Sequence, residues 1–416
     1  MHIKSSLALI IVVFFSLSVN AQRGTYSPYS FYGVGSQSFK ATAENRSMAG
    51  LSVYSDSIHL NLQNPAAYGD LKLTTFTGGI TVNSVDYASE NQSDNYRYTT
   101  IDYFAIGIPT KIGGFGIGLR PTTAVGYEIS ESLENQNSVL QGRGGLNTTY
   151  LSWGYELIKN LKIGATANYN FGTIENKSLI FRSQVQYGSR DFNESNINGF
   201  SFDFGGLYDY YISKHKYIRL SARHQTGSAL SAKSTRSASS IVIASDGTEI
   251  AVDEIIINDI NADVNLAETT SIGVGFGEQL KWFVGAEYNI RTAPDFTALN
   301  FNVPNNVSYE DANEFKIGGF FTPRYNSPRG FYNRLTYRAG LRYQDTNMRI
   351  NGQTIDEFGI SFGVGVPAGR YFTNANFGIE YGRRGTKANS LIQEDFLSIF
   401  VSFSFNDKWF VERRFN

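Results

Sequence analysis

Apolar and polar residues alternate along most of the chain after residue 71, which is the pattern of strands whose two faces meet different surroundings. In residues 161–172 the odd positions are all apolar, whereas the even positions are Lys, Gly, Thr or Asn. The same alternation recurs in 358–366 and 373–382. The pattern predicts about fourteen strands, near residues 71–87, 96–108, 114–130, 146–157, 161–187, 198–212, 216–235, 268–277, 281–296, 311–325, 332–350, 357–367, 371–386 and 391–405.

The strand expected at 332–350 carries arginines on one face, namely Arg334, Arg338 and Arg342, and mostly apolar residues on the other. An arginine at the lipid-facing midplane of a membrane barrel costs about 2 to 4 kcal/mol. In a barrel Arg338 must therefore point into a polar lumen, whereas in a soluble sandwich the same face would meet solvent.

The lengths of the connections favour the barrel. Short connections follow every second strand and longer polar ones follow the others, as in bacterial outer-membrane barrels. The short ones include 158–160, 213–215, 278–280 and 368–370, and the longer ones include 131–145 and 188–197. We expect an all-β, transmembrane antiparallel barrel in residues 69–416, placed in the bacterial outer membrane.

The N-terminus has the features of an export signal. Lys4 precedes an apolar run at 7–17, and Ala21 is a small residue of the kind that signal peptidase reads, so residues 1–21 are expected to be removed. The chain has no cysteine, which excludes a disulfide framework and an N-terminal lipid on cysteine. A formal net charge of −1 argues against nucleic acid as a partner.

Residues 43–68 are the last stretch that does not read as a strand before the barrel begins. They contain the tripeptide Asn64, Pro65 and Ala66, in which the proline removes a backbone donor. One interpretation is a linker with a turn. The sequence MAGLSVYSDSIHLNLQNPAAY also resembles the N-terminal signature of FadL/TodX outer-membrane transporters of hydrophobic compounds. That resemblance implies a barrel of fourteen strands, with residues 22–68 folded into the lumen as a plug.

Pro121 lies within the third expected strand, where a proline removes a ladder hydrogen bond. A simple bulge would account for it. The FadL/TodX resemblance instead implies a kink in this strand, through which ligand leaves sideways into the membrane. Pro121 is therefore a candidate lateral gate.

The longest expected loop, 236–267, contains aliphatic residues, among them Ile241 and Ile243, on either side of Asp246-Gly247. Such a dipeptide between alternating runs predicts a hairpin. The hairpin could simply extend the barrel above the membrane. Alternatively, Ile241 and Ile243 could form an exposed patch that captures an apolar ligand.

The inward arginines supply the remaining candidate chemistry. Arg223 and Arg338 could pair with carboxylates and with the plug backbone, or they could bind the carboxylate of a ligand. The histidines have no catalytic or metal-binding spacing around them, so we expect neither enzymatic activity nor a cofactor or metal.

Together these features predict passive uptake of hydrophobic small molecules, such as long-chain fatty acids or aromatic hydrocarbons, through plug rearrangement and lateral exit. Barrels that resemble this family also serve in type IX protein secretion. A subunit of such a complex, with a protein partner in addition to the outer-membrane lipids, is the alternative.

Overall fold

A computed structural model of the chain describes residues 23–296, 306–328, 330–367 and 373–409; the expected signal peptide lies outside them. The larger part is a single antiparallel sheet. Its wall strands are β2 (Thr74–Ala88), β3 (Ser93–Thr110), β4 (Gly113–Pro121), β5 (Thr123–Leu133), β6 (Gln136–Ile158), β7 (Leu161–Arg182), β8 (Gly188–Tyr211), β9 (Lys216–Gln225), β10 (Ser228–Ile243), β11 (Glu249–Leu266), β12 (Thr269–Glu278), β13 (Trp282–Arg291), β15 (Ala312–Phe321), β16 (Thr336–Ile350), β17 (Gln353–Pro367), β18 (Asn374–Arg384) and β19 (Gln393–Asp407).

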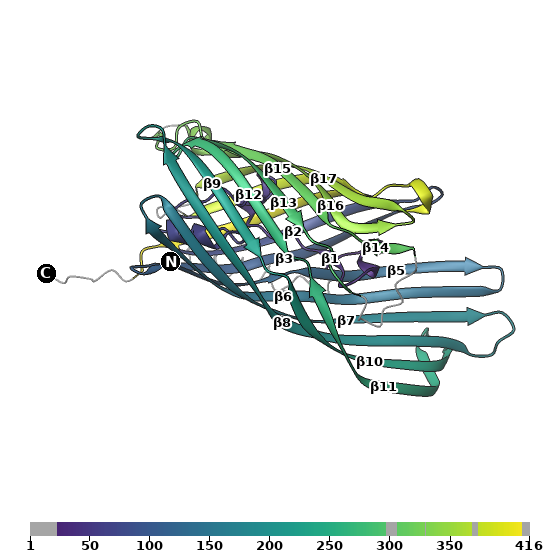
Figure 1. Cartoon of the computed structure of the whole chain (residues 1–416). Helices are drawn as coiled ribbons and strands as arrows, with labels where there is room; N and C mark the ends of the chain where they lie inside the picture. The colour runs from purple at the N-terminus through teal and green to yellow at the C-terminus, as the bar shows by residue number, and fades with distance from the viewer. Residues whose placement is uncertain (1–22, 297–305, 329, 368–372, 410–416) are drawn as a thin grey trace, which may run out of the picture.

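The sheet closes on itself because β19 pairs with β2, from Gln393 opposite Ala88 to Asp407 opposite Thr74. Three wall strands are interrupted, so that β4 with β5, β9 with β10, and β11 with β12 each form one strand of the wall. Among the described residues the result is a closed barrel of 14 antiparallel strands, which confirms the predicted fold class. In Figure 1 the strands β5, β6, β7, β8, β10 and β11 extend beyond the others at one end.

The barrel is apolar outside and polar inside. Large apolar side chains such as Leu151 (57% exposed) and Phe200 (61%) stand on the outer face, whereas Arg338 and Glu380 are buried on the inner face. This arrangement is that of a membrane barrel, since lipid accepts the outer side chains and charged groups avoid it. No helix among the described residues is long and apolar enough to cross a membrane.

The connections differ from the expected ones. Residues 131–145 and 188–197, predicted to be long outer loops, are mostly strand, because β5, β6 and β8 continue past the membrane as hairpins. The 368–370 turn lies outside the described residues. A long connection also occurs on the side of the short turns, where 322–335 contains the 3₁₀ turn η3 (Phe331–Arg334). Arg334 lies in this turn and is exposed, so its expected place on the inner face of a strand is wrong.

The residues before the wall form short elements: η1 (Pro28–Phe31), β1 (Ser36–Gln37), α2 (Ala43–Arg46) and η2 (Pro65–Asp70). Most residues from 41 to 53 are buried, and their partners are inward-facing wall residues. Arg46 Nε donates to Glu380 Oε2 on β18 at 2.8 Å. The Ser52 backbone N–H donates to Glu287 Oε2 on β13 at 2.7 Å.

The Asn-Pro-Ala tripeptide begins η2. The Asn64 side chain accepts a hydrogen bond from the Ala66 backbone N–H at 3.0 Å, and Pro65 stands where a helix needs no N–H donor. The same side chain donates to Ser221 Oγ on β9 at 3.1 Å. The tripeptide thus joins the N-terminal segment to the wall.

Wall glycines allow this close approach. A Cβ added at Gly164 would lie 2.4 Å from the Pro65 carbonyl carbon, and one added at Gly340 would lie 2.3 Å from the Ala49 nitrogen. Among other wall glycines, Gly363 meets Ser47 of the N-terminal segment, whereas the space at Gly359, Gly365 and Gly378 is occupied by wall side chains. Ala66 itself lies against Gly164.

Candidate functional site

The wall is interrupted in its third strand, directly after Pro121. The ladder between β3 and β4 runs from Thr110 opposite Gly113 to Phe104 opposite Leu119 and ends there. On the other side β4 and β5 both stay paired with β6. Among the described residues, no ladder therefore joins residues 93–103 of β3 to β5.

The position of Pro121 explains where the ladder ends. The Thr122 backbone N–H donates to Leu146 O on β6 at 2.7 Å. In an extended chain successive N–H groups point to opposite sides. The backbone nitrogen of Pro121 therefore faces β3, and it carries no hydrogen that it could donate to that strand.

Part of the N-terminal segment occupies the edge of β5. Ser36 and Gln37 of β1 pair with Ala124 and Thr123, and the Ser38 N–H donates to Thr122 O at 2.9 Å. The backbone groups that β3 leaves unpaired on β5 are thus partly satisfied from inside the barrel.

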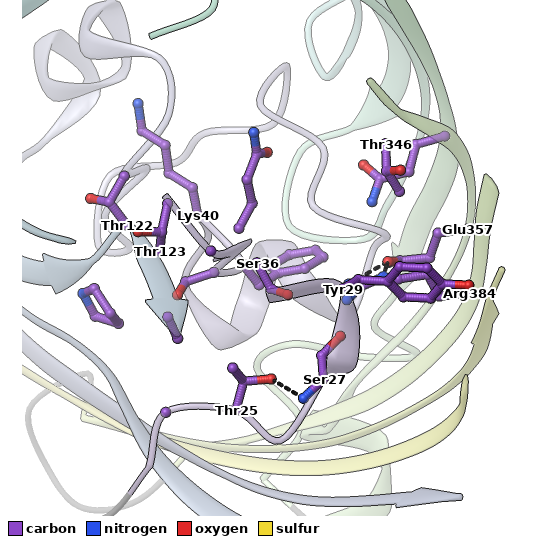
Figure 2. A pocket seen from close by; sticks show the side chains of 18 of the residues that line it. Thr25, Ser27, Tyr29, Ser36, Lys40, Thr122, Thr123, Thr346, Glu357 and Arg384 are labelled. Atoms are coloured by element: carbon purple, nitrogen blue, oxygen red, sulfur yellow. Dashed lines mark hydrogen bonds and ion pairs between the residues drawn. The ribbon is translucent and has the colours of Figure 1, made fainter. Parts of the chain in front are cut away.

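A cavity of about 620 Å³ lies at this interruption. Figure 2 shows Lys40, Thr122 and Thr123 on one side of it, Glu357 and Arg384 on the other, and Ser36 between them. Its lining also includes Ile101 of β3, whose side chain is 55% exposed on the outer face. The cavity therefore extends from the lumen to the interrupted part of the wall.

One wall of the cavity is rich in cations. Lys40 Nζ contacts Asp203 Oδ2 at 3.1 Å, and Arg223 lies 3.8 Å from the other oxygen of the same carboxylate. Arg120 is buried beside them, and its Nε–H donates to no acceptor among the described residues. Lys40 and Arg223 thus share the Asp203 carboxylate, with Arg120 near enough to interact electrostatically, so cations outnumber carboxylates in this group.

Lys40 is the titratable member of this group. Burial lowers the pKa of its ammonium group to about 7, with Arg223 and Arg120 acting in the same direction and Asp203 opposing them. The charge of this cavity wall therefore changes near neutral pH.

The cavity also has an apolar side. Val34 and Phe296 line it and belong to a buried cluster that continues away from the cavity, between the extended strands. The other members of the cluster are Val125, Tyr127, Leu146, Ile174, Ile197, Leu230, Ala232 and Val264. The lining of the cavity thus includes apolar as well as cationic side chains.

The structure separates several residues that were considered together. Ile243 is 48% exposed, but Ile241 is fully buried, so the expected exposed patch of both residues is wrong. Arg223 lines the cavity, whereas Arg338 is outside its lining and donates to Asn376 Oδ1 at 3.1 Å. Arg342 pairs with Glu357 and Glu380.

The partly buried His59 belongs to the N-terminal segment. Its Nδ1 lies 2.6 Å from Asp56 Oδ2. Burial alone would lower the pKa of His59, but Asp56 and, more weakly, Glu44 raise it above its usual value. No group of three or more His, Cys, Asp or Glu side chains suited to a metal ion occurs in the described part of the chain.

Sequence reasoning missed Lys40, Arg120 and Arg291 as cavity residues. Arg120 directly precedes Pro121 and alternates with the outward Leu119, so the period of the strand indicated its inward direction. Lys40 lies in an irregular stretch, where no period exists to indicate a direction.

The fold and the apolar outer face define a barrel protein of the bacterial outer membrane. A family model described as BamG matches residues 2–416, and the chain therefore belongs to the BamG family. This is not the family named by the N-terminal resemblance, which is supported at the level of the fold. No curated protein matches the sequence.

Solved structures with a similar fold include hydrocarbon transporters. The Ralstonia pickettii toluene transporter TbuX is 16% identical, with 89% of this chain and 99% of that chain covered and a TM-score of 0.59. The Pseudomonas putida toluene transporter TodX is 15% identical, with 92% and 98% covered and a TM-score of 0.52. A Pseudomonas aeruginosa FadL homologue is 10% identical, with 89% and 98% covered and a TM-score of 0.52.

Proposed function

We propose that this protein is a non-enzymatic outer-membrane channel for passive uptake of hydrophobic small molecules, with lateral exit between β3 and β5. The observation that carries the proposal is the cavity whose lining includes both Lys40, in the barrel interior, and Ile101, exposed on the outer face. A ligand that leaves there enters the bilayer without crossing the aqueous periplasm.

In this mechanism residues 22–68 act as the plug, and the short ladder between β1 and β5 breaks when the aperture opens. Two paired residues hold the edge, so few hydrogen bonds must break for the aperture to widen. Pro121 is the lateral gate, because it keeps β3 from extending the ladder into the aperture.

The ligand class follows from the two sides of the cavity. Arg223, with Lys40 and Arg120, holds an anionic head group, while Val34 and Phe296 contact an apolar tail. Such a ligand is an amphiphile of the long-chain fatty acid type. Arg338 has no part in this step, because it does not line the cavity.

The test is uptake of labelled fatty acid by cells that carry Pro121→Ala at the same surface abundance as the parent. Restoring the N–H lets the ladder extend, so uptake should slow several-fold with little change in heat stability. Pro109→Ala is the matched control, since Pro109 lies in β3 opposite Gly114, within an intact ladder. Equal uptake by the parent and Pro121→Ala cells would reject lateral exit.

A barrel subunit of a type IX protein-secretion complex is the second candidate. It is favoured by the ion pairs that hold the chain before β2 to the wall, since Arg46 pairs with Glu380 and Asp70 pairs with Lys162. A segment held in this way suits a permanently closed barrel. Purification in mild detergent distinguishes the two: a stoichiometric protein complex supports the subunit, and a single chain with bound amphiphile supports the channel.

A further inference from the structure

The hairpin of β10 and β11 lies beyond the membrane. The strands that lead into and out of it, β9 and β12, have 10 residues each. A tilted membrane strand needs about 9 to 11 residues, so β9 and β12 complete the crossing. Beyond them β10 and β11 continue into the aqueous surroundings on the side opposite the short turns, and the hairpin projects at the lower right of Figure 1.

Among the described residues, β11 has a ladder on one side only over most of its length. It pairs with β10 on one side from Glu249 to Leu266. On its other side the described residues make a single bridge, in which Asn265 and Asp295 exchange backbone hydrogen bonds of 3.0 and 3.1 Å. Asn261 and Asp263 have the same parity as Asn265, so their N–H and C=O groups point to the same open side.

The open edge carries exposed aliphatic residues without lipid to cover them. Ile250, Val252, Ile255 and Ile256 are each 49% to 66% exposed. The strand has no lysine or proline, which are common protections of sheet edges. An unprotected edge of this kind is a template on which another extended chain can pair.

The charge of β11 indicates which kind of extended chain would pair with its edge. Its sequence contains five acidic residues and no basic one. Glu249 and Glu254 are paired with Lys177 and Arg190, but Asp253 and Asp263 have no ion pair among the described residues. These carboxylates repel the phosphates of lipid head groups and attract cations.

We propose that β11 is a docking edge for an extended segment of a partner protein at the cell surface, in which Lys or Arg alternates with aliphatic residues. The partner adds a strand beside β11, and its cations face Asp253 and Asp263. This inference is independent of the uptake proposal, because residues 249–265 do not line the cavity.

A photo-crosslinking amino acid at Asn261 of the full chain in living cells tests the proposal. The partner peptide, sequenced by mass spectrometry, should be a basic and aliphatic segment. The same crosslinker at Ser240, exposed on β10 but paired on both sides, is the control and should give no such product. A crosslink to a second copy of this chain, to an acidic segment, or to no protein overturns the proposal.

A binding experiment separates strand addition from simple charge attraction. The probe is a labelled ten-residue peptide of alternating Lys and Val, titrated onto the detergent-solubilised full chain. Asp253→Lys with Asp263→Lys should weaken binding at least tenfold, whereas Asp94→Lys, exposed on β3, should leave it unchanged. A probe with N-methylated backbone should bind at least tenfold more weakly. Equal binding of the methylated probe, or no effect of the double charge reversal, overturns the proposal.

Discussion

Ser36 of the N-terminal segment pairs with Ala124 of β5, on a strand edge that the neighbouring wall strand β3 leaves open. The barrel thus completes part of its wall with a piece of chain that is not itself a wall strand. Because lipid offers no hydrogen bonds, backbone groups at this depth must be satisfied by protein or by water in the lumen. The N-terminal segment therefore supplies hydrogen bonds to the wall at the place where β3 does not.

The first prediction concerns this contact. Ser38→Pro removes the N–H that donates to Thr122 O at 2.9 Å, and the loss of such a hydrogen bond costs about 0.5 to 1.5 kcal/mol. We expect β1 to detach and the conductance of the barrel in planar bilayers to rise. Ser38→Ala keeps the N–H and should conduct like the parent. If both variants conduct alike, β1 does not close the aperture.

The second prediction concerns the anchor of α2. Glu380 accepts from Arg46 and from Arg342, and all three side chains are buried. Glu380→Gln should destabilise the fold by about 3 to 5 kcal/mol, because two buried guanidinium groups lose their shared carboxylate. Thermal unfolding in detergent measures the effect. Arg383→Gln on the same strand breaks the exposed pair with Asp395 and should cost less than about 1 kcal/mol.

The third prediction tests close packing at the Asn-Pro-Ala tripeptide. Gly164→Val places a side chain where a Cβ would already be 2.4 Å from the Pro65 carbonyl carbon, which should cost about 1 to 3 kcal/mol. Residues near η2 should then become accessible to protease. Gly206→Val is the control, since a Cβ there approaches nothing nearer than 3.9 Å. Equal protease resistance of both variants would mean that the segment is not held at this point.

The fourth prediction concerns pH. With a pKa of about 7, Lys40 is charged below neutral pH and loses its charge above it. An anionic ligand favours the charged form, so its affinity should fall as pH rises from about 6 to 8, by up to about tenfold. Dodecane sulfonate, which stays ionised over this range, is the probe for titration calorimetry.

Lys40→Met should bind the sulfonate weakly and with a flat pH profile. The other charged groups that face Lys40 are Asp203 of β8, Arg223 of β9 and Arg120 of β4. A pH profile that persists in Lys40→Met would assign the titration to one of these groups or to another site.

The barrel could be predicted from the sequence, because the alternation of side chains along a strand is a local property. Whether Leu341 or Arg342 faces lipid follows from the two-residue period and from the high cost of arginine in lipid. Leu341 is indeed 50% exposed and Arg342 is buried. The third strand was also recognisable as special, since proline lacks a donor wherever it stands.

The arrangement of the lumen was decided by tertiary structure alone. Barrel closure brings Arg120 of β4, Arg223 of β9 and Lys40 together, although they are far apart in the chain. Which wall glycine packs against Pro65 depends on the register of each pair of strands around the barrel. The local sequence does not determine those registers. Ile241 and Ile243 look alike in sequence. Both point to the same face of β10, but the neighbouring strand β8 reaches only as far as Ile241, opposite Gly188, so Ile241 is buried and Ile243, beyond the end of β8, is half exposed.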